Sequence, residues 1–130
     1  MRISLKDEQI LEHIVRYCNQ AAETIKYFSG IGISFHDNFI YQDAVSMELL
    51  QIGELSKHLS DELKKNTSSI PWKAISGMRN RFAHDYQSMD YDAIINTAIN
   101  DLPLLKRQCQ AILQSEHEHG ETDFHNANCD

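Results

Sequence analysis

Hydrophobic side chains recur every three or four residues through most of the chain, which is the spacing of one face of an α-helix. The first stripe covers about residues 5–28, with Ser4 and Asp7 placed as a capping pair at its start. Its apolar members are Leu11, Ile14, Cys18, Ala21, Ile25 and Phe28. Glycines within residues 29–32 end this predicted helix, because glycine readily adopts the left-handed conformation common at helix ends.

A second predicted helix covers about residues 38–64. Its core side carries Tyr41, Val45, Leu49, Ile52, Leu59 and Leu63. At about 100° per residue, Met47 and Leu50 fall on the opposite side, beside Asp43 and Glu54. This second apolar patch indicates either a partner surface or two exposed side chains that need no special explanation.

Two further helices follow. Pro71 suits the first turn of a helix over about residues 71–83, which buries Trp72, Ile75 and Phe82. The next begins near residues 88–91, and Pro103 should kink or restart it, with Asp101 as a candidate new cap. Its core side carries Ile94, Ile95, Ala98, Leu102, Leu105, Cys109 and Ile112.

These patterns predict an all-α fold, because no segment shows the alternation of a strand and the connections are short. Four amphipathic helices of this kind are typical of an antiparallel four-helix bundle with a kinked last helix. We assign residues 1–114 to this helical domain. Periodicity is lost afterwards, so residues 115–130 are predicted to form a flexible, disordered, acidic and histidine-rich tail.

Composition supports a globular protein, with 42% hydrophobic and 24% charged residues. Three cysteines without a CxxC pair exclude a disulfide framework and a four-thiolate zinc site, and favour a reducing, cytoplasmic location. No stretch resembles a signal segment or a membrane span, so we expect no membrane partner. His117, His119 and His125 could bind a divalent metal, but ordering a floppy tail costs entropy, and we predict no metal site and no cofactor.

The charge is unevenly placed along the chain. The net charge is −7, yet residues 57–86 carry six basic residues against three acidic ones, a local charge of +3. Since the local field decides whether a phosphate can approach, this segment permits contact with RNA without requiring it.

Residues 79–86 concentrate the side chains most able to do chemistry: Arg79, Asn80, Arg81, His84 and Tyr86. Cleavage of RNA without a metal needs a base for the 2′-OH proton, an acid for the leaving 5′-oxygen and a cation for the phosphate oxygens. Histidine suits the proton steps because its pKa lies near neutral, and arginine suits the third role through its forked donors.

Helix geometry sets a condition on this site. Five residues of an ideal helix turn by about 500°, so Arg79 and His84 would point about 140° apart. They can address one phosphate only if the helix ends between them or if a second subunit completes the site. From these residues alone, an ordinary helix end with basic side chains favoured by the helix dipole is the simpler explanation.

The same residues resemble a known family. The pattern from Arg79 to Tyr86 is similar to the R-x4-H-x-Y signature of HepT-like toxins, of the HEPN superfamily and of HepT/MntA-type toxin–antitoxin systems. Two flanking stretches resemble that family too, namely the Ile-Gly-Glu of residues 52–54 and the Trp-led residues 72–78. The resemblance covers about residues 5–113.

The resemblance implies a homodimeric, metal-independent endoribonuclease, the toxin of a type VII-like toxin–antitoxin system. Its partner would be a minimal nucleotidyltransferase antitoxin that adds AMP to Tyr86. The two proteins could also form a larger complex. By the same resemblance, Arg79 would stabilise the transition state, His84 would handle protons and Asn80 would orient the phosphate. The dimer would also bring two copies of the motif around one cleft and cover the Met47/Leu50 side.

Other residues are expected to support the motif. Glu54 is a candidate partner for Arg79 or Arg81, and Arg81 and Lys73 are candidates for contacts with RNA or with the motif's neighbours. A different class stays open: some bundles of this superfamily resemble non-catalytic helper subunits that present a nucleotide or substrate to a nucleotidyltransferase. A purely structural interaction protein is the third alternative.

Overall fold

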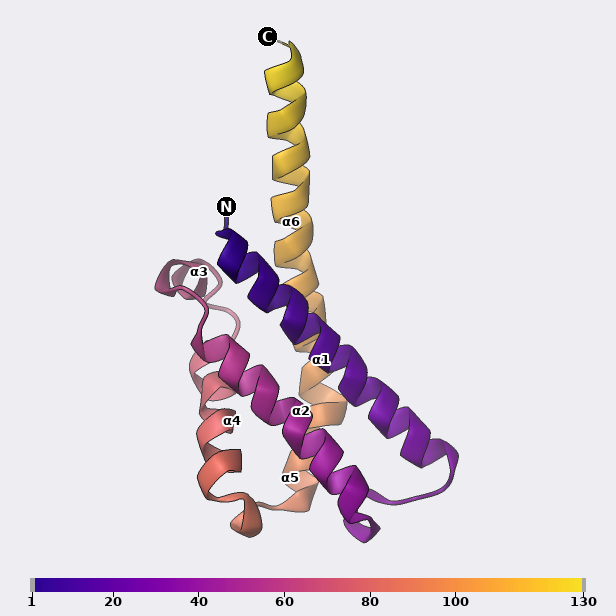
Figure 1. Ribbon diagram of the computed structural model, residues 1–130. Coiled ribbons are helices and arrows are strands. Elements are labelled where there is room, and N and C mark those ends of the chain that lie inside the picture. The colour runs from indigo at the N-terminus through magenta and orange to yellow at the C-terminus, as the bar shows by residue number, and fades with distance from the viewer. Residues whose placement is uncertain (1, 130) are drawn as a thin grey trace.

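The computed structural model describes the backbone of residues 2–129 and the side chains of residues 2–115. Over this part the chain is helical, without a strand, as predicted. The main helices are α1 (Leu5–Gly30), α2 (Phe39–Lys57), α4 (Trp72–His84) and α6 (Leu102–Cys129). They alternate in direction, and α2 packs against both α1 and α4 while α6 packs against α1 (Figure 1). The predicted all-α bundle is therefore confirmed.

The start of α1 is held by two different contacts. Ser4 Oγ accepts the backbone N–H of Asp7 at 3.0 Å, which confirms the predicted cap. The Asp7 carboxylate turns inward instead of capping, is only 2% exposed, and accepts the backbone N–H of Ser60 at 2.9 Å and its hydroxyl at 2.5 Å. A buried carboxylate with two donors ties the first helix to a loop 53 residues away.

The predicted helix over residues 38–64 is wrong in extent. It begins as expected, where Asn38 Oδ1 accepts the N–H of Tyr41 at 2.9 Å, but α2 ends at Lys57 and α3 (Asp61–Asn66) is a separate helix. Ser60 caps α3 by accepting the N–H of Leu63 at 3.2 Å. The cap and the Asp7 contact stabilise the break, and Leu59 and Leu63 are nevertheless both buried.

The last helical segment is irregular where Pro103 predicts it. A short helical turn, η1 (Phe35–Asp37), precedes α2. After α4 come η2 (Tyr86–Ser88) and α5 (Tyr91–Asn96), and the chain then passes through a π-helical turn, η3 (Thr97–Asp101), directly into α6. Proline lacks an N–H and crowds the carbonyl four residues earlier, which a wider turn relieves. Asp101 is the last residue of this turn, directly before α6, and belongs to the helical turn, so it is not the cap of a separate helix and that prediction is wrong.

The backbone of α6 stays helical to Cys129 and projects beyond the rest of the bundle (Figure 1). The sequence predicts a disordered segment for residues 115–130, whereas the structure has helical backbone over residues 115–129. The side chains of residues 116–130, including His117, His119 and His125, lie outside the described part. Because a helix without packing neighbours is only marginally stable in water, the flexibility of this tail stays a prediction.

The core follows the predicted stripes closely. Fully buried members include Leu11 and Ile14 of α1, Val45 and Ile52 of α2, and Cys109 of α6. Burial raises the pKa of Cys18 and of Cys109 to about 12, so both thiols stay protonated at neutral pH. Over the residues searched, no helix has the length and apolar character needed to cross a lipid bilayer.

We predict that Asp7→Ala lowers the free energy of unfolding by about 1–3 kcal/mol, because it leaves two donors of Ser60 without their acceptor. Lys6→Ala is the matched control, since Lys6 is the exposed neighbour on the same turn. Urea denaturation followed by circular dichroism measures both. Equal unfolding midpoints for the two variants would show that the Asp7–Ser60 contact contributes nothing to stability.

Candidate active site

The site is built where α2 and α4 approach each other most closely, at Gly53. A Cβ placed on Gly53 would lie 2.8 Å from the backbone nitrogen of Arg79 and 2.9 Å from the carbonyl oxygen of Ile75. Real Cβ atoms do not come that close, so only glycine permits this packing. The Ile-Gly-Glu stretch thereby places Glu54 directly beside Arg79.

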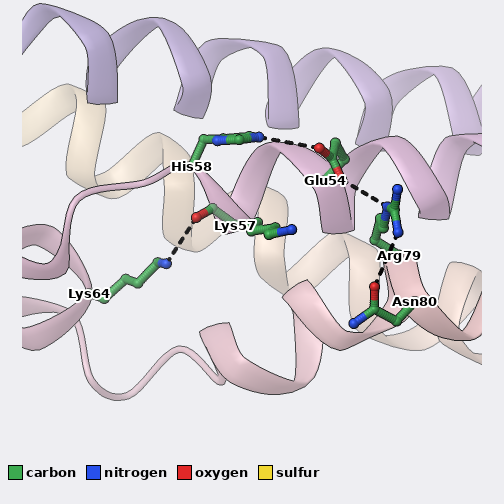
Figure 2. Close-up of polar contacts among 6 residues, drawn as sticks. All are labelled: Glu54, Lys57, His58, Lys64, Arg79 and Asn80. Carbon is green, nitrogen blue, oxygen red and sulfur yellow. Dashed lines mark hydrogen bonds and ion pairs between the residues drawn. The ribbon is translucent and has the colours of Figure 1, made fainter.

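Glu54 and Arg79 form an ion pair, with 3.1 Å between Glu54 Oε2 and Arg79 Nε. On its other side Glu54 Oε1 lies 3.2 Å from His58 Nε2, and Arg79 Nη1 donates to Asn80 Oδ1 at 3.3 Å (Figure 2). The hydrogen bond from His58, and next the charges of Arg79 and Lys57, lower the pKa of Glu54 and favour its ionised form. The sequence left open whether Glu54 meets Arg79 or Arg81, and the structure selects Arg79.

His84 lies elsewhere on the same helix. α4 is regular from Trp72 through His84, and the Asp85 N–H still bonds to the Arg81 carbonyl at 2.8 Å. Helical rotation therefore leaves Arg79 and His84 about 140° apart, with Arg79 against α2 and His84 exposed. The helix does not end between them, so the first of the two conditions for bringing both side chains to one phosphate is not met.

Tyr86 follows α4 and lies against α2. Its hydroxyl donates to Asp43 Oδ1 at 2.9 Å, and its ring lies next to Phe82, with centroids 6.3 Å apart. Burial, with a further contribution from the Asp43 carboxylate, raises the pKa of Tyr86, so the phenol is neutral at physiological pH. The surface groove at this point is lined by Asp43, Ser46, Met47, Leu50, Phe82 and Tyr86.

This groove contains the second apolar patch predicted on α2. Met47 is 54% exposed and Leu50 is half-buried, so the patch is present but unequal. It lies beside the end of the motif because Tyr86 reaches across to the same face of α2. That proximity could not be read from the periodicity of α2 alone.

The two basic candidates outside the motif's centre occupy different places. Arg81 lies about 200° round α4 from Arg79 and lines a groove with Thr97 and Asp101, so it is not next to Glu54. Lys73 is exposed near the start of α4 and lines a groove with Lys57. The structure thus groups Glu54, Arg79 and Asn80 and separates them from Arg81.

Two partners of the site were missed from the sequence. His58 follows Glu54 by four residues, a spacing that places both on one helix face and could have revealed the contact. Asp43 meets Tyr86 across 43 residues, and no local pattern signals such a pair. Among the residues searched, the structure contains no cluster of three or more His, Cys, Asp or Glu able to hold a metal ion.

Comparison with known proteins relates the part of the chain that contains this site to a family of ribonucleases. The family model described as "Ribonuclease HepT-like" matches residues 17–112, which include every residue of the site described above. No solved structure gives a significant match.

Individual relatives agree with the family match. A candidate RNase of Caldanaerobacter subterraneus subsp. tengcongensis is 36% identical over 110 residues, which cover 82% of this chain and 93% of that protein. A candidate RNase of Methanocaldococcus jannaschii is 28% identical over 93 residues, covering 71% and 85%. A protein of Thermococcus cleftensis named as a probable ribonuclease HepT is 35% identical over 65 residues, covering 50% and 59%.

We predict that Gly53→Ala lowers the free energy of unfolding by about 1–3 kcal/mol, because the new methyl group overlaps the backbone of α4. Gly77→Ala is the matched control: nothing lies within 4 Å of its added Cβ, and in a helix interior alanine should stabilise by about 0.5–1 kcal/mol. Thermal and urea unfolding of both variants measure the difference. A Gly53→Ala protein as stable as the Gly77→Ala protein would contradict the close packing.

Proposed function

We propose that this chain, which belongs to the HepT-like ribonuclease family, is a metal-independent endoribonuclease that acts as the toxin of a toxin–antitoxin pair in the cytoplasm. The observation that carries the proposal is Arg79, held by Glu54 at the surface of α4, in the same helix as an exposed His84. An oriented guanidinium suits the stabilisation of charge on the phosphate oxygens, and a solvent-accessible imidazole suits the proton transfers of RNA cleavage without a metal.

The chemistry assigns one step to each side chain. The 2′-oxygen attacks the neighbouring phosphorus as it loses its proton, the bond to the 5′-oxygen breaks, and that oxygen takes up a proton. The products are a 2′,3′-cyclic phosphate and a free 5′-OH. His84 serves the proton transfers, Arg79 stabilises the charge on the phosphate oxygens, and Asn80, which accepts a hydrogen bond from Arg79, orients the phosphate.

The position of these groups supports a homodimer. Since α4 keeps Arg79 and His84 about 140° apart, helix geometry alone does not direct both at a single phosphate. A second copy supplies the missing direction, and a symmetric pair of copies is the commonest form of association. The exposed Met47 beside Tyr86 gives this contact apolar surface next to the motif.

Regulation by a minimal nucleotidyltransferase antitoxin is assigned to Tyr86. Its hydroxyl lies at the surface end of the groove, where Asp43 holds it, and it is two residues from His84. An added AMP would bring negative charge and bulk to the position that an RNA phosphate must approach. The modified toxin and its antitoxin could then stay together in a larger complex.

Purified protein is expected to cleave RNA in the presence of EDTA. His84→Ala should lower the cleavage rate by about 10²–10⁴-fold, the usual contribution of an acid–base group. Arg79→Lys should lose most of the activity, because lysine lacks the forked donors of arginine. His13→Ala is the control, because His13 is also exposed but lies on α1. Helicity and dimerisation should be unchanged in all variants. Cleavage that requires a metal, or that survives His84→Ala, would refute the mechanism.

Tyr86→Phe is expected to keep RNA cleavage and to escape neutralisation, because it removes only the hydroxyl that receives AMP. Incubation with the antitoxin and ATP, followed by intact mass spectrometry, should show AMP on wild-type protein and none on Tyr86→Phe. Tyr27→Phe is the control, since Tyr27 is 63% exposed on α1. AMP attached to Tyr86→Phe at the wild-type level would place the modification elsewhere.

A further inference from the structure

A groove beside the candidate active site is lined by lysines from three different helices. Lys57 ends α2, Lys64 lies in α3, and Lys73 is near the start of α4, with Ser68 and Ser76 between them. Among the described residues, its lining contains no acidic side chain. We call Lys57, Lys64, Lys73 and the two serines the lysine groove.

The lysine groove leads toward Arg79 through Ser76, the groove residue that is one interval of three from Arg79 on α4. On α4, residues 73, 76 and 79 follow one another at intervals of three, each about 60° round the helix from the one before, so Ser76 lies between Lys73 and Arg79, and Lys73 is about 9 Å from Arg79 along the axis. On α2, Glu54 and Lys57 have the same interval. Because α2 and α4 are antiparallel, both stripes lead from the Glu54–Arg79 pair in the same direction, and Figure 2 shows Lys57 extending toward that pair.

The local charge of this surface is positive although the chain as a whole is acidic. Glu54 offsets the charge of Arg79, so the lysines supply the remaining field. The acids of α3, Asp61 and Glu62, occupy its first turn and do not line the groove. A concave surface with one sign of charge attracts the opposite sign more strongly than isolated side chains do.

Helix ends account for two of these lysines, because Lys57 lies in the last turn of α2 and Lys64 in the last turn of α3, where the helix dipole favours a cation. Lys64 Nζ donates to the carbonyl of Lys57 at 3.4 Å, which satisfies the end of α2. Lys73 has the opposite relation to its helix, because it lies in the first turn of α4, where the helix dipole disfavours a cation. Since the positive charge of Lys73 does not stabilise α4, binding to a group outside the helix is the better explanation for a lysine at this position.

We propose that the lysine groove binds the phosphates of the RNA strand that flanks the cleaved nucleotide. The proposal rests on the ribonuclease function stated above and adds the path of the substrate. Lysine binds phosphate as a point charge, so this binding adds affinity without sequence preference. Trp72 at the base of the groove is only 4% exposed, so it offers no ring face on which a base could stack.

The test measures binding apart from cleavage. In the full-length His84→Ala protein, the affinity for a fluorescent single-stranded RNA is measured by anisotropy over a range of salt concentrations. Lys73→Gln and Lys57→Gln should each lower the affinity by about two- to fivefold and lower the slope of log K against log salt by about 0.7. Lys73→Arg should restore both. Lys26→Gln, the same change at an exposed residue of α1, should have no effect.

The outcomes separate the binding path from the ribonuclease proposal. If wild-type protein cleaves RNA but the lysine variants keep wild-type affinity and salt slope, the proposed binding of RNA in the lysine groove is wrong, whereas the ribonuclease proposal stands. Lysine variants that bind RNA normally but lose the complex with the antitoxin would also overturn the proposed binding, because the groove would then be a protein contact. Lysine-dependent RNA binding by a wild-type protein that cleaves no RNA would support the path and refute the ribonuclease proposal.

Discussion

The close packing of α2 on α4 at Gly53 is the constraint on which the rest of the site depends. A side chain at this position would overlap the backbone at Ile75 and Arg79, so the two helices can meet only where one residue has no Cβ. This contact sets the register that places Glu54 against Arg79 and directs the guanidinium along the surface. The orientation of α4 relative to the bundle then determines where every later residue of the motif points.

Regular helix geometry divides the motif between two surfaces. The Arg79 side of α4 leads through Ser76 to the lysine groove, whereas the chain after His84 turns so that Tyr86 meets Asp43 and the Met47 patch on α2. In our account, the RNA strand beside the cleaved bond binds at the first surface. The second surface brings the subunit contact and the modified Tyr86 next to His84, where the cleaved phosphate approaches.

Much of the architecture is predictable because the helices carry local signals. The stripe of α1 and the proline before α4 predict helices close to Leu5–Gly30 and Trp72–His84, and the pairing of Glu54 with an arginine of the motif is foreseeable. The break between α2 and α3 is not, because it depends on Ser60 meeting the carboxylate of Asp7, a contact between distant residues. The Tyr86–Asp43 hydrogen bond is hidden for the same reason. The fold class thus follows from periodicity, while the contacts that complete the site arise only in three dimensions.

Mixing two inactive variants tests the central claim most directly. Arg79→Ala and His84→Ala proteins are inactive alone in our account, but a heterodimer of the two retains one intact Arg79 and one intact His84 on different chains. If the cleaving site is shared between copies, mixing after subunit exchange should restore RNA cleavage to a substantial fraction of the wild-type rate. A mixture that demonstrably forms heterodimers and yet stays as inactive as its components would contradict a shared site.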